Sequence, residues 1–166
     1  LRRRVTESYK GAFFELRSRK DLAEPLFPGV REALDALHAR DDTVLGIATG
    51  KSQRGLRHAL ELHGLRDYFV TLQTADDAPS KPHPEMLLRA MREAGADAAD
   101  TVLVGDTSYD MAMARSAGAH AFGVDWGYHE PHLLRSAGAH LVLSDFAELA
   151  PAADALWTGK GQAIGA

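Results

Sequence analysis

Short apolar runs alternate with longer stretches of helical periodicity along most of this chain. The runs that have the length of buried strands are Thr43–Ala48, Phe69–Leu72, Thr101–Val104, Ala121–Val124 and Leu141–Leu143. The stretches with helical spacing between them are Val30–Ala39, Ser52–His63, Glu85–Glu93, Ser108–Ser116 and Glu130–Ser136. This alternation predicts an α/β fold with a doubly wound parallel sheet.

Glycines mark the ends of the predicted helices, where a residue in the left-handed conformation is favoured. They are Gly64, Gly95, Gly118 and Gly138. One short repeat accompanies them, because the sequence of Arg115–His120 recurs at Arg135–His140. Since no more than six residues recur, we interpret the repeat as two equivalent junctions between a helix and a strand. His120 and His140 are then expected at loop or strand-entry positions rather than as metal ligands.

The first two dozen residues differ in character from the rest. Their basic residues are Arg2, Arg3, Arg4, Lys10, Arg17, Arg19 and Lys20, and the apolar side chains of Tyr9, Phe13, Phe14 and Leu16 have roughly helical spacing. A basic amphipathic helix is compatible with binding to an anionic surface or nucleic acid. The favoured interpretation is a solvated basic face on a helix that packs against something outside this chain.

Composition is that of an ordinary globular domain. With 166 residues, of which 45% are apolar and 25% charged, the chain can bury one core. A net charge of -4 argues against general nucleic-acid binding, and the absence of cysteine excludes disulfides and thiolate chemistry. No apolar run is long enough to span a membrane and no secretory signal opens the chain, so we expect a cytoplasmic protein without a membrane partner. The chain begins with Leu1 rather than Met, which we interpret as a start partway into a longer protein.

The segment Val102–Asp110 is the strongest candidate for chemistry. Its apolar run predicts a buried strand with Asp106 at the carboxyl end, where open α/β sheets bind ligands, and Asp110 falls one turn into the next helix. Two carboxylates at this spacing suit Mg²⁺, which takes one or two carboxylates and completes its shell with water and phosphate oxygens. The alternative is that Asp106 only caps the helix.

A second candidate is Leu45–Lys51, a strand that ends in a hydroxyl and a glycine before a helix. Thr49 could donate to a phosphate oxygen beside backbone N–H groups, or Thr49 or Ser52 could simply cap the helix. The segment Gly46–Ser52 ends like a nucleotide-binding P-loop. We reject that match because only three residues separate its glycines and Gly46 lies inside the predicted strand.

The third candidate is Ser80–Glu85, where Lys81 precedes Pro82 and Pro84 stands where a helix favours proline. A lysine restrained in this way meets a phosphate at little entropic cost. The alternative is an exposed loop lysine without a functional partner.

Taken in order, these three sites resemble the second, third and fourth motifs of the haloacid dehalogenase superfamily of Mg²⁺-dependent phosphohydrolases. The resemblance is to its phosphoglycolate phosphatase-like branch and covers roughly Leu26 to Leu149. The segments that carry it are Phe27–Val30, Ala48–Lys51, Ser80–Pro84 and Gly105–Met111. It implies a Rossmann-like core that hydrolyses a small phosphorylated metabolite.

The resemblance also implies a role for each candidate residue. Asp106 would bind Mg²⁺ directly, and Asp110 would hold a metal-bound water or orient the lysine. Thr49 and Gly50 would bind the phosphoryl group, and Lys81 would offset its charge, since phosphoryl transfer depends mainly on positioning and charge stabilisation.

The family's first motif departs from this pattern, because no Asp-x-Asp occurs in the chain. The pairs Asp41-Asp42 and Asp76-Asp77 are adjacent, so their side chains would point to opposite faces of a strand. The resemblance therefore implies the end of a helical cap at residues 1–24, a core lacking its first, central strand at 25–157, and a flexible tail at 158–166. Such a chain is expected to be inactive alone, with strands on both sides of a gap in the sheet.

Two other functional classes stay open. One is a non-catalytic module that keeps the fold and binds a metal, a phosphate or a partner. The other is a flavodoxin-like or receiver-like domain, which leaves Lys81 and the Gly105–Asp110 motif without a common explanation. The substrate and the oligomeric state are not readable from these residues.

Overall fold

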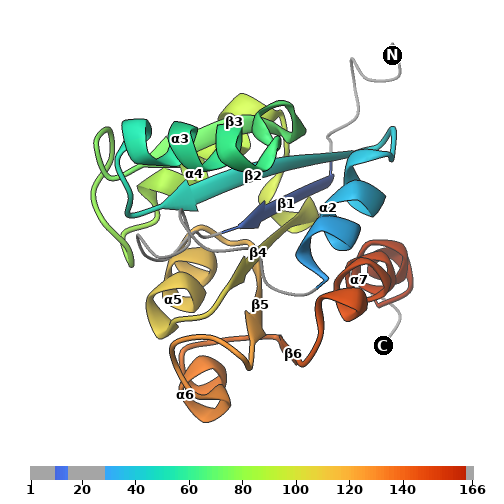
Figure 1. Cartoon of the computed structure of the whole chain (residues 1–166). Coiled ribbons are helices and arrows are strands. Elements are labelled where there is room, and N and C mark those ends of the chain that lie inside the picture. Colours follow the sequence, from blue (N-terminus) through green and yellow to red (C-terminus); the bar gives the residue numbers. More distant parts are fainter. Residues whose placement is uncertain (1–9, 15–28, 164–166) are drawn as a thin grey trace.

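A parallel sheet forms the centre of the protein (Figure 1), in a computed structural model that describes residues 10–14 and 29–163. Its strands are β1 (Lys10–Phe14), β2 (Thr43–Thr49), β3 (Phe69–Thr74), β4 (Thr101–Gly105), β5 (His120–Val124) and β6 (Leu141–Leu143). They lie in the order β3-β2-β1-β4-β5-β6, and every neighbouring pair is parallel. The predicted doubly wound α/β fold is confirmed.

The helices alternate with the strands as the periodicity predicts. They are α2 (Val30–His38), α3 (Gln53–His63), α4 (Glu85–Ala94), α5 (Ser108–Ser116), α6 (Pro131–Ser136) and α7 (Leu149–Ala163). Short 3₁₀ turns span Arg66–Tyr68, Ala98–Asp100 and Phe146–Glu148. The four glycines predicted to end helices all have positive φ. Each strand and helix predicted between residues 30 and 143 is thus present, with ends that differ by at most two residues.

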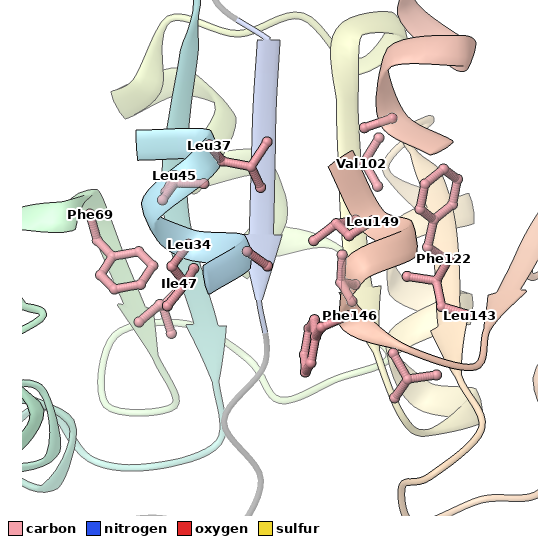
Figure 2. Packing of buried hydrophobic residues seen from close by; sticks show 14 of the residues in the cluster. Leu34, Leu37, Leu45, Ile47, Phe69, Val102, Phe122, Leu143, Phe146 and Leu149 are labelled. Carbon is pink, nitrogen blue, oxygen red and sulfur yellow. The ribbon is translucent and has the colours of Figure 1, made fainter. Parts of the chain in front are cut away.

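Alternate residues of the strands point to opposite faces of the sheet and build two cores. On one face, Leu45 and Ile47 of β2 pack with α2 and α7. On the other, Leu103 of β4 and Ala121 of β5 pack with α4, α5 and α6. Figure 2 shows the first core, where Leu34 and Leu37 of α2 lie near the side chains of β2. Since both faces are covered, the strands read as nearly continuous apolar runs.

The N-terminal segment differs from its prediction. Residues 10–14, which were expected in a cap helix, form strand β1, and β1 pairs with β2 and β4 in the middle of the sheet. The expected gap is therefore absent from the described sheet. The physical reason is that β2 and β4 would otherwise present unpaired N–H and C=O groups to each other across a buried slot. The rest of the predicted cap segment lies outside the described residues.

The C-terminal segment also differs from its prediction. The expected flexible tail from residue 158 is helical as far as Ala163, because α7 runs through it. Ala153 and Trp157 anchor α7 in the core, and the Trp157 indole donates to the Asp100 carbonyl at 3.1 Å. Neither α7 nor another helix in the described ranges is long and apolar enough to cross a bilayer.

The six-residue repeat occupies two equivalent junctions, as predicted. His120 begins β5 and His140 directly precedes β6. Their rings meet edge to face at 5.3 Å, and His140 Nδ1 accepts the Ala121 N–H at 2.9 Å. The pKa of His140 is lowered by desolvation of its ring and by the positive charge of Arg115, with a smaller effect of His120.

Hydrogen exchange tests the placement of β1. Backbone amides of a central strand are bonded to one neighbour or the other, so the amides of residues 11–14 should exchange on the order of 100-fold or more slowly than unprotected ones. The exchange rates of an unstructured peptide of the same sequence provide the unprotected reference. Rapid exchange at residues 11–14, with β2 and β4 still protected, would contradict a strand at this position.

The lowered pKa of His140 predicts a pH-dependent stability. Because the unfolded chain binds this proton near the ordinary histidine pKa of about 6.5, it takes up more protons than the folded chain as the pH falls below that value. The free energy of unfolding should therefore fall between pH 7 and pH 5. His140→Asn, which keeps an acceptor for Ala121, should lessen that fall in urea titrations. Equal pH dependence in the variant and the wild type would refute the assignment.

Candidate active site

The candidate residues gather at the carboxyl edge of the sheet. Thr49 ends β2, and Asp106 directly follows β4, so the two residues flank the carboxyl end of β1. The direction of chain winding reverses between β1 and β4, and open α/β sheets bind their ligands at such a reversal. Figure 1 shows α5 leaving β4 at this edge.

Asp110 is the most constrained of these residues. Its side chain is fully buried, and its Oδ1 accepts the Lys81 ammonium at 2.8 Å. Its Oδ2 accepts the N–H of Thr107 at 3.1 Å and the Thr107 hydroxyl at 2.8 Å. The Asp110 N–H in turn donates to Thr107 Oγ1 at 3.2 Å, which completes a capping box at the start of α5. Both carboxylate oxygens of Asp110 are therefore engaged by the protein.

Gly105 gives Asp110 its space. A Cβ at position 105 would lie 2.4 Å from the Asp110 Cβ, a distance that carbon atoms do not tolerate. The Gly-Asp sequence at the end of β4 is thus explained by close packing against the carboxylate one turn later.

Lys81 reaches the site from the loop between β3 and α4. Its side chain is only 12% exposed and ends on Asp110, so the alternative of an exposed loop lysine without a partner is wrong. The Lys81–Pro82 peptide bond is cis, and Pro84 precedes α4 as the spacing of the prolines predicts.

Asp106 is held by a different part of the chain. Tyr128, in the loop after β5, donates its N–H to Asp106 Oδ2 at 2.8 Å, and the N–H of His129 donates to the Asp106 carbonyl at 3.0 Å. The residue is 8% exposed. Since the cap of α5 is Thr107, the alternative that Asp106 serves as the helix cap is wrong.

Thr49 is buried at the end of β2, and its Oγ1 accepts the N–H of Lys51 at 3.2 Å. The cap of α3 is Ser52, whose hydroxyl accepts the Gly55 N–H at 3.1 Å. Of the two capping alternatives, Ser52 is therefore the one that holds. Gly50 is exposed, and among the described residues a Cβ there would meet no atom within 4 Å.

The four predicted residues thus fall into two groups. Lys81 and Asp110 are in direct contact, and Asp106 lies on the same turn as the Thr107 cap that binds Asp110. Thr49 stands on the other side of β1, at the same edge of the sheet. This arrangement places two carboxylates, one ammonium group and one hydroxyl at the same edge of the sheet. Their catalytic roles stay predictions.

Sequence reasoning missed the loop after β5, which holds Asp106. A Cβ at Gly127 would lie 2.2 Å from the Asp106 Cβ, so this position requires glycine for the loop to approach. Tyr128 and His129 follow it. The signal was available, because these residues come just after a strand end at Val124, as the other candidates do, but they carry no familiar motif.

A divalent cation fits the donor set at Asp106. Within residues 10–14 and 29–163, no group of three or more His, Cys, Asp or Glu side chains is arranged as a metal centre. A metal held by Asp106 would complete its shell with other ligands, as Mg²⁺ does with water and phosphate oxygens.

Comparison with known proteins identifies the class. The family described as haloacid dehalogenase-like hydrolase matches residues 6–124, and the chain belongs to this family. A probable phosphatase, IndB, of Dickeya dadantii is 45% identical over 132 residues, which cover 79% of this chain and 57% of that protein. A phosphoglycolate phosphatase of Chromobacterium violaceum is 36% identical over 140 residues, which cover 82% of this chain and 61% of that protein. The chain thus spans less than two thirds of the length of these relatives.

Solved structures agree. A conserved haloacid dehalogenase-like protein of Agrobacterium tumefaciens has a TM-score of 0.68 and 28% identity, with coverage of 78% of this chain and 60% of that one. A predicted phosphoglycolate phosphatase of Haemophilus somnus has a TM-score of 0.71 and 26% identity, with coverage of 80% and 60%. The resemblance given by the three motifs is therefore confirmed at the level of family and fold.

The buried pair yields a stability prediction. Asp110→Asn removes the buried carboxylate charge that Lys81 contacts, in a site that is nearly closed to water, so the free energy of unfolding should fall by about 3 kcal/mol. Arg92→Ala removes a solvent-exposed ion pair with Glu85 and should cost no more than about 1 kcal/mol.

Urea denaturation of both variants measures the difference. The double variant Lys81→Met/Asp110→Asn should recover part of the loss, because the uncompensated charge is gone. A loss in Asp110→Asn no greater than in Arg92→Ala would show that the pair does not stabilise the fold.

Proposed function

We propose that this chain supplies the phosphate-binding and Mg²⁺-binding part of a phosphohydrolase that acts on a small phosphorylated metabolite. The observation that carries the proposal is the division between the two carboxylates. Asp110 is fully buried, is paired with Lys81 and accepts hydrogen bonds on both oxygens, whereas Asp106 is 8% exposed and stands at the switch point of the sheet. A second carboxylate at such a point suits a cation that in turn attracts phosphate.

Mg²⁺ is the cofactor that this division favours. Asp106 would be the direct ligand, because Asp110 is fully buried and both of its oxygens already accept hydrogen bonds from Lys81 and Thr107. Asp110 would act by orienting Lys81 and the start of α5. When bound, Mg²⁺ would offset the negative charge that phosphoryl transfer gathers on the phosphate oxygens.

The remaining residues would bind and orient the phosphoryl group. Thr49 would offer its hydroxyl, and the backbone at Gly50, where a Cβ would meet no described residue within 4 Å, would allow a phosphate oxygen to approach. Lys81 donates to Asp110, and its ammonium charge would counter that of the phosphate.

The motif that carries the nucleophile in the family is missing from this chain. In the family it belongs to an Asp-x-Asp motif, which is absent here, and would form an aspartyl-phosphate that water then hydrolyses. The position between β2 and β4, where the resemblance expects that strand, is taken by β1, whose sequence KGAFF contains no carboxylate.

A second candidate function follows from that same observation. A sheet whose central strand β1 carries no carboxylate is compatible with a non-catalytic module that binds a metal and a phosphate. Binding without turnover is then the expected behaviour of the 166-residue chain.

Phosphate-ester hydrolysis tests the proposal. The 166-residue chain should bind Mg²⁺ in calorimetric titrations without hydrolysing p-nitrophenyl phosphate or phosphoglycolate. The protein extended by the coding sequence upstream of Leu1 should hydrolyse a phosphate ester if that sequence contains Asp-x-Asp. Asp106→Asn should weaken Mg²⁺ binding more than Asp110→Asn does.

Three results would count against this proposal. Robust turnover by the 166-residue chain alone would identify another nucleophile. Equal loss of Mg²⁺ affinity in the two variants would contradict the division of roles. No Mg²⁺ binding to either form of the protein would remove the metal from the proposal.

A further inference from the structure

Two consecutive backbone N–H groups of the loop after β5 donate hydrogen bonds to Asp106. The N–H of Tyr128 donates to the Asp106 carboxylate at 2.8 Å, and the N–H of His129 donates to its carbonyl at 3.0 Å. Gly127 lets the loop come this close, because a Cβ there would overlap the Asp106 side chain. The orientation of Asp106 therefore depends on where this loop is held.

The His129 side chain holds the loop to α5. Its Nδ1 accepts the N–H of Ser108, the first residue of α5, at 2.9 Å. That N–H is one of the groups at a helix start that have no partner within the helix. Since Nδ1 accepts, we assign the neutral ring its hydrogen on Nε2. The contact spans 21 residues of sequence.

Two tyrosines flank the ring. The centroid of His129 lies 5.8 Å from that of Tyr109 and 5.7 Å from that of Tyr128. Tyr109 belongs to α5 and Tyr128 to the loop, so ring packing joins the same two elements that the hydrogen bond joins. A substitution at position 129 must therefore separate the packing of the ring from its acceptor.

We propose that His129 is a positioning residue for Asp106. By accepting the Ser108 N–H it fixes the loop against α5, and the fixed loop places the N–H of Tyr128 on the Asp106 carboxylate. The inference rests on the proposed function, because it gives Asp106 the task of binding Mg²⁺. It adds a residue outside the three motifs to the set that the site depends on.

Two variants at position 129 separate the packing of the ring from its role as a hydrogen-bond acceptor. His129→Phe keeps a ring between the tyrosines and removes the acceptor, whereas His129→Asn gives up the ring and keeps an acceptor at a similar distance from the backbone. We expect His129→Phe to weaken Mg²⁺ binding by about 10- to 100-fold, the usual cost of losing a group that orients a metal ligand. His129→Asn should stay within about threefold of the wild type.

Amide hydrogen exchange measured by NMR provides a readout that does not depend on Mg²⁺ or on activity. The amides of Ser108 and Tyr128 should exchange faster in His129→Phe than in the wild type and should be restored in His129→Asn. Protection throughout β4 and β5 shows that each variant is folded, and His132→Phe, at an exposed position of α6, is the matched control at a histidine outside the loop.

The outcomes are distinguishable. If His129→Phe retains both Mg²⁺ affinity and protection of the two amides, the proposal is overturned. If His129→Asn is the damaged variant and His129→Phe is not, the ring acts by packing alone and the positioning role is wrong. If the wild type binds no Mg²⁺, the proposed function fails, and the exchange of the Ser108 and Tyr128 amides still decides whether His129 fixes the loop.

Discussion

The ion pair between Asp110 and Lys81 is the interaction on which the rest of the site depends. A fully buried carboxylate is costly unless each oxygen has a partner, and here Lys81 and Thr107 supply those partners. The consequences spread outward from this requirement. Thr107 must cap α5, position 105 must be glycine, and the loop before α4 must turn inward so that its lysine reaches the edge of the sheet.

Most of the fold was predictable because its patterns are local. A buried parallel strand needs a run of apolar residues, and a helix that covers it needs apolar residues at 3.6-residue spacing. Both patterns are present in the sequence of β2 and α2, so these elements could be predicted. Strand β1 could not be predicted in this way, because its partners lie far along the chain at residues 43–47 and 101–104. Its few apolar residues also fit helical spacing. The helix at the C-terminus was hidden by Gly159 and Gly161, whose low propensity is overridden by packing of Trp157 in the core.

The candidate site shows the same division between local and distant information. Asp106, Thr49 and Lys81 were found because each lies in a motif at a strand end or in the loop beside it, and the geometry of parallel sheets brings such ends to one edge. The pairing of Lys81 with Asp110 crosses 29 residues and required coordinates. The loop after β5 binds Asp106 through backbone N–H groups. Every residue but proline has such a group, so no pattern of side chains could predict this contact.

Charge explains why the two carboxylates need not do the same work. Lys81 and Asp110 form a neutral pair, so among the four predicted site residues Asp106 contributes the remaining negative charge. A phosphate group approaching Thr49 and Lys81 would meet that charge at close range, where partial exclusion of water strengthens repulsion. A divalent cation bound to Asp106 would make the local charge positive, so that the phosphate would be attracted rather than repelled. The charges of these four residues thus support the metal that we propose for the site.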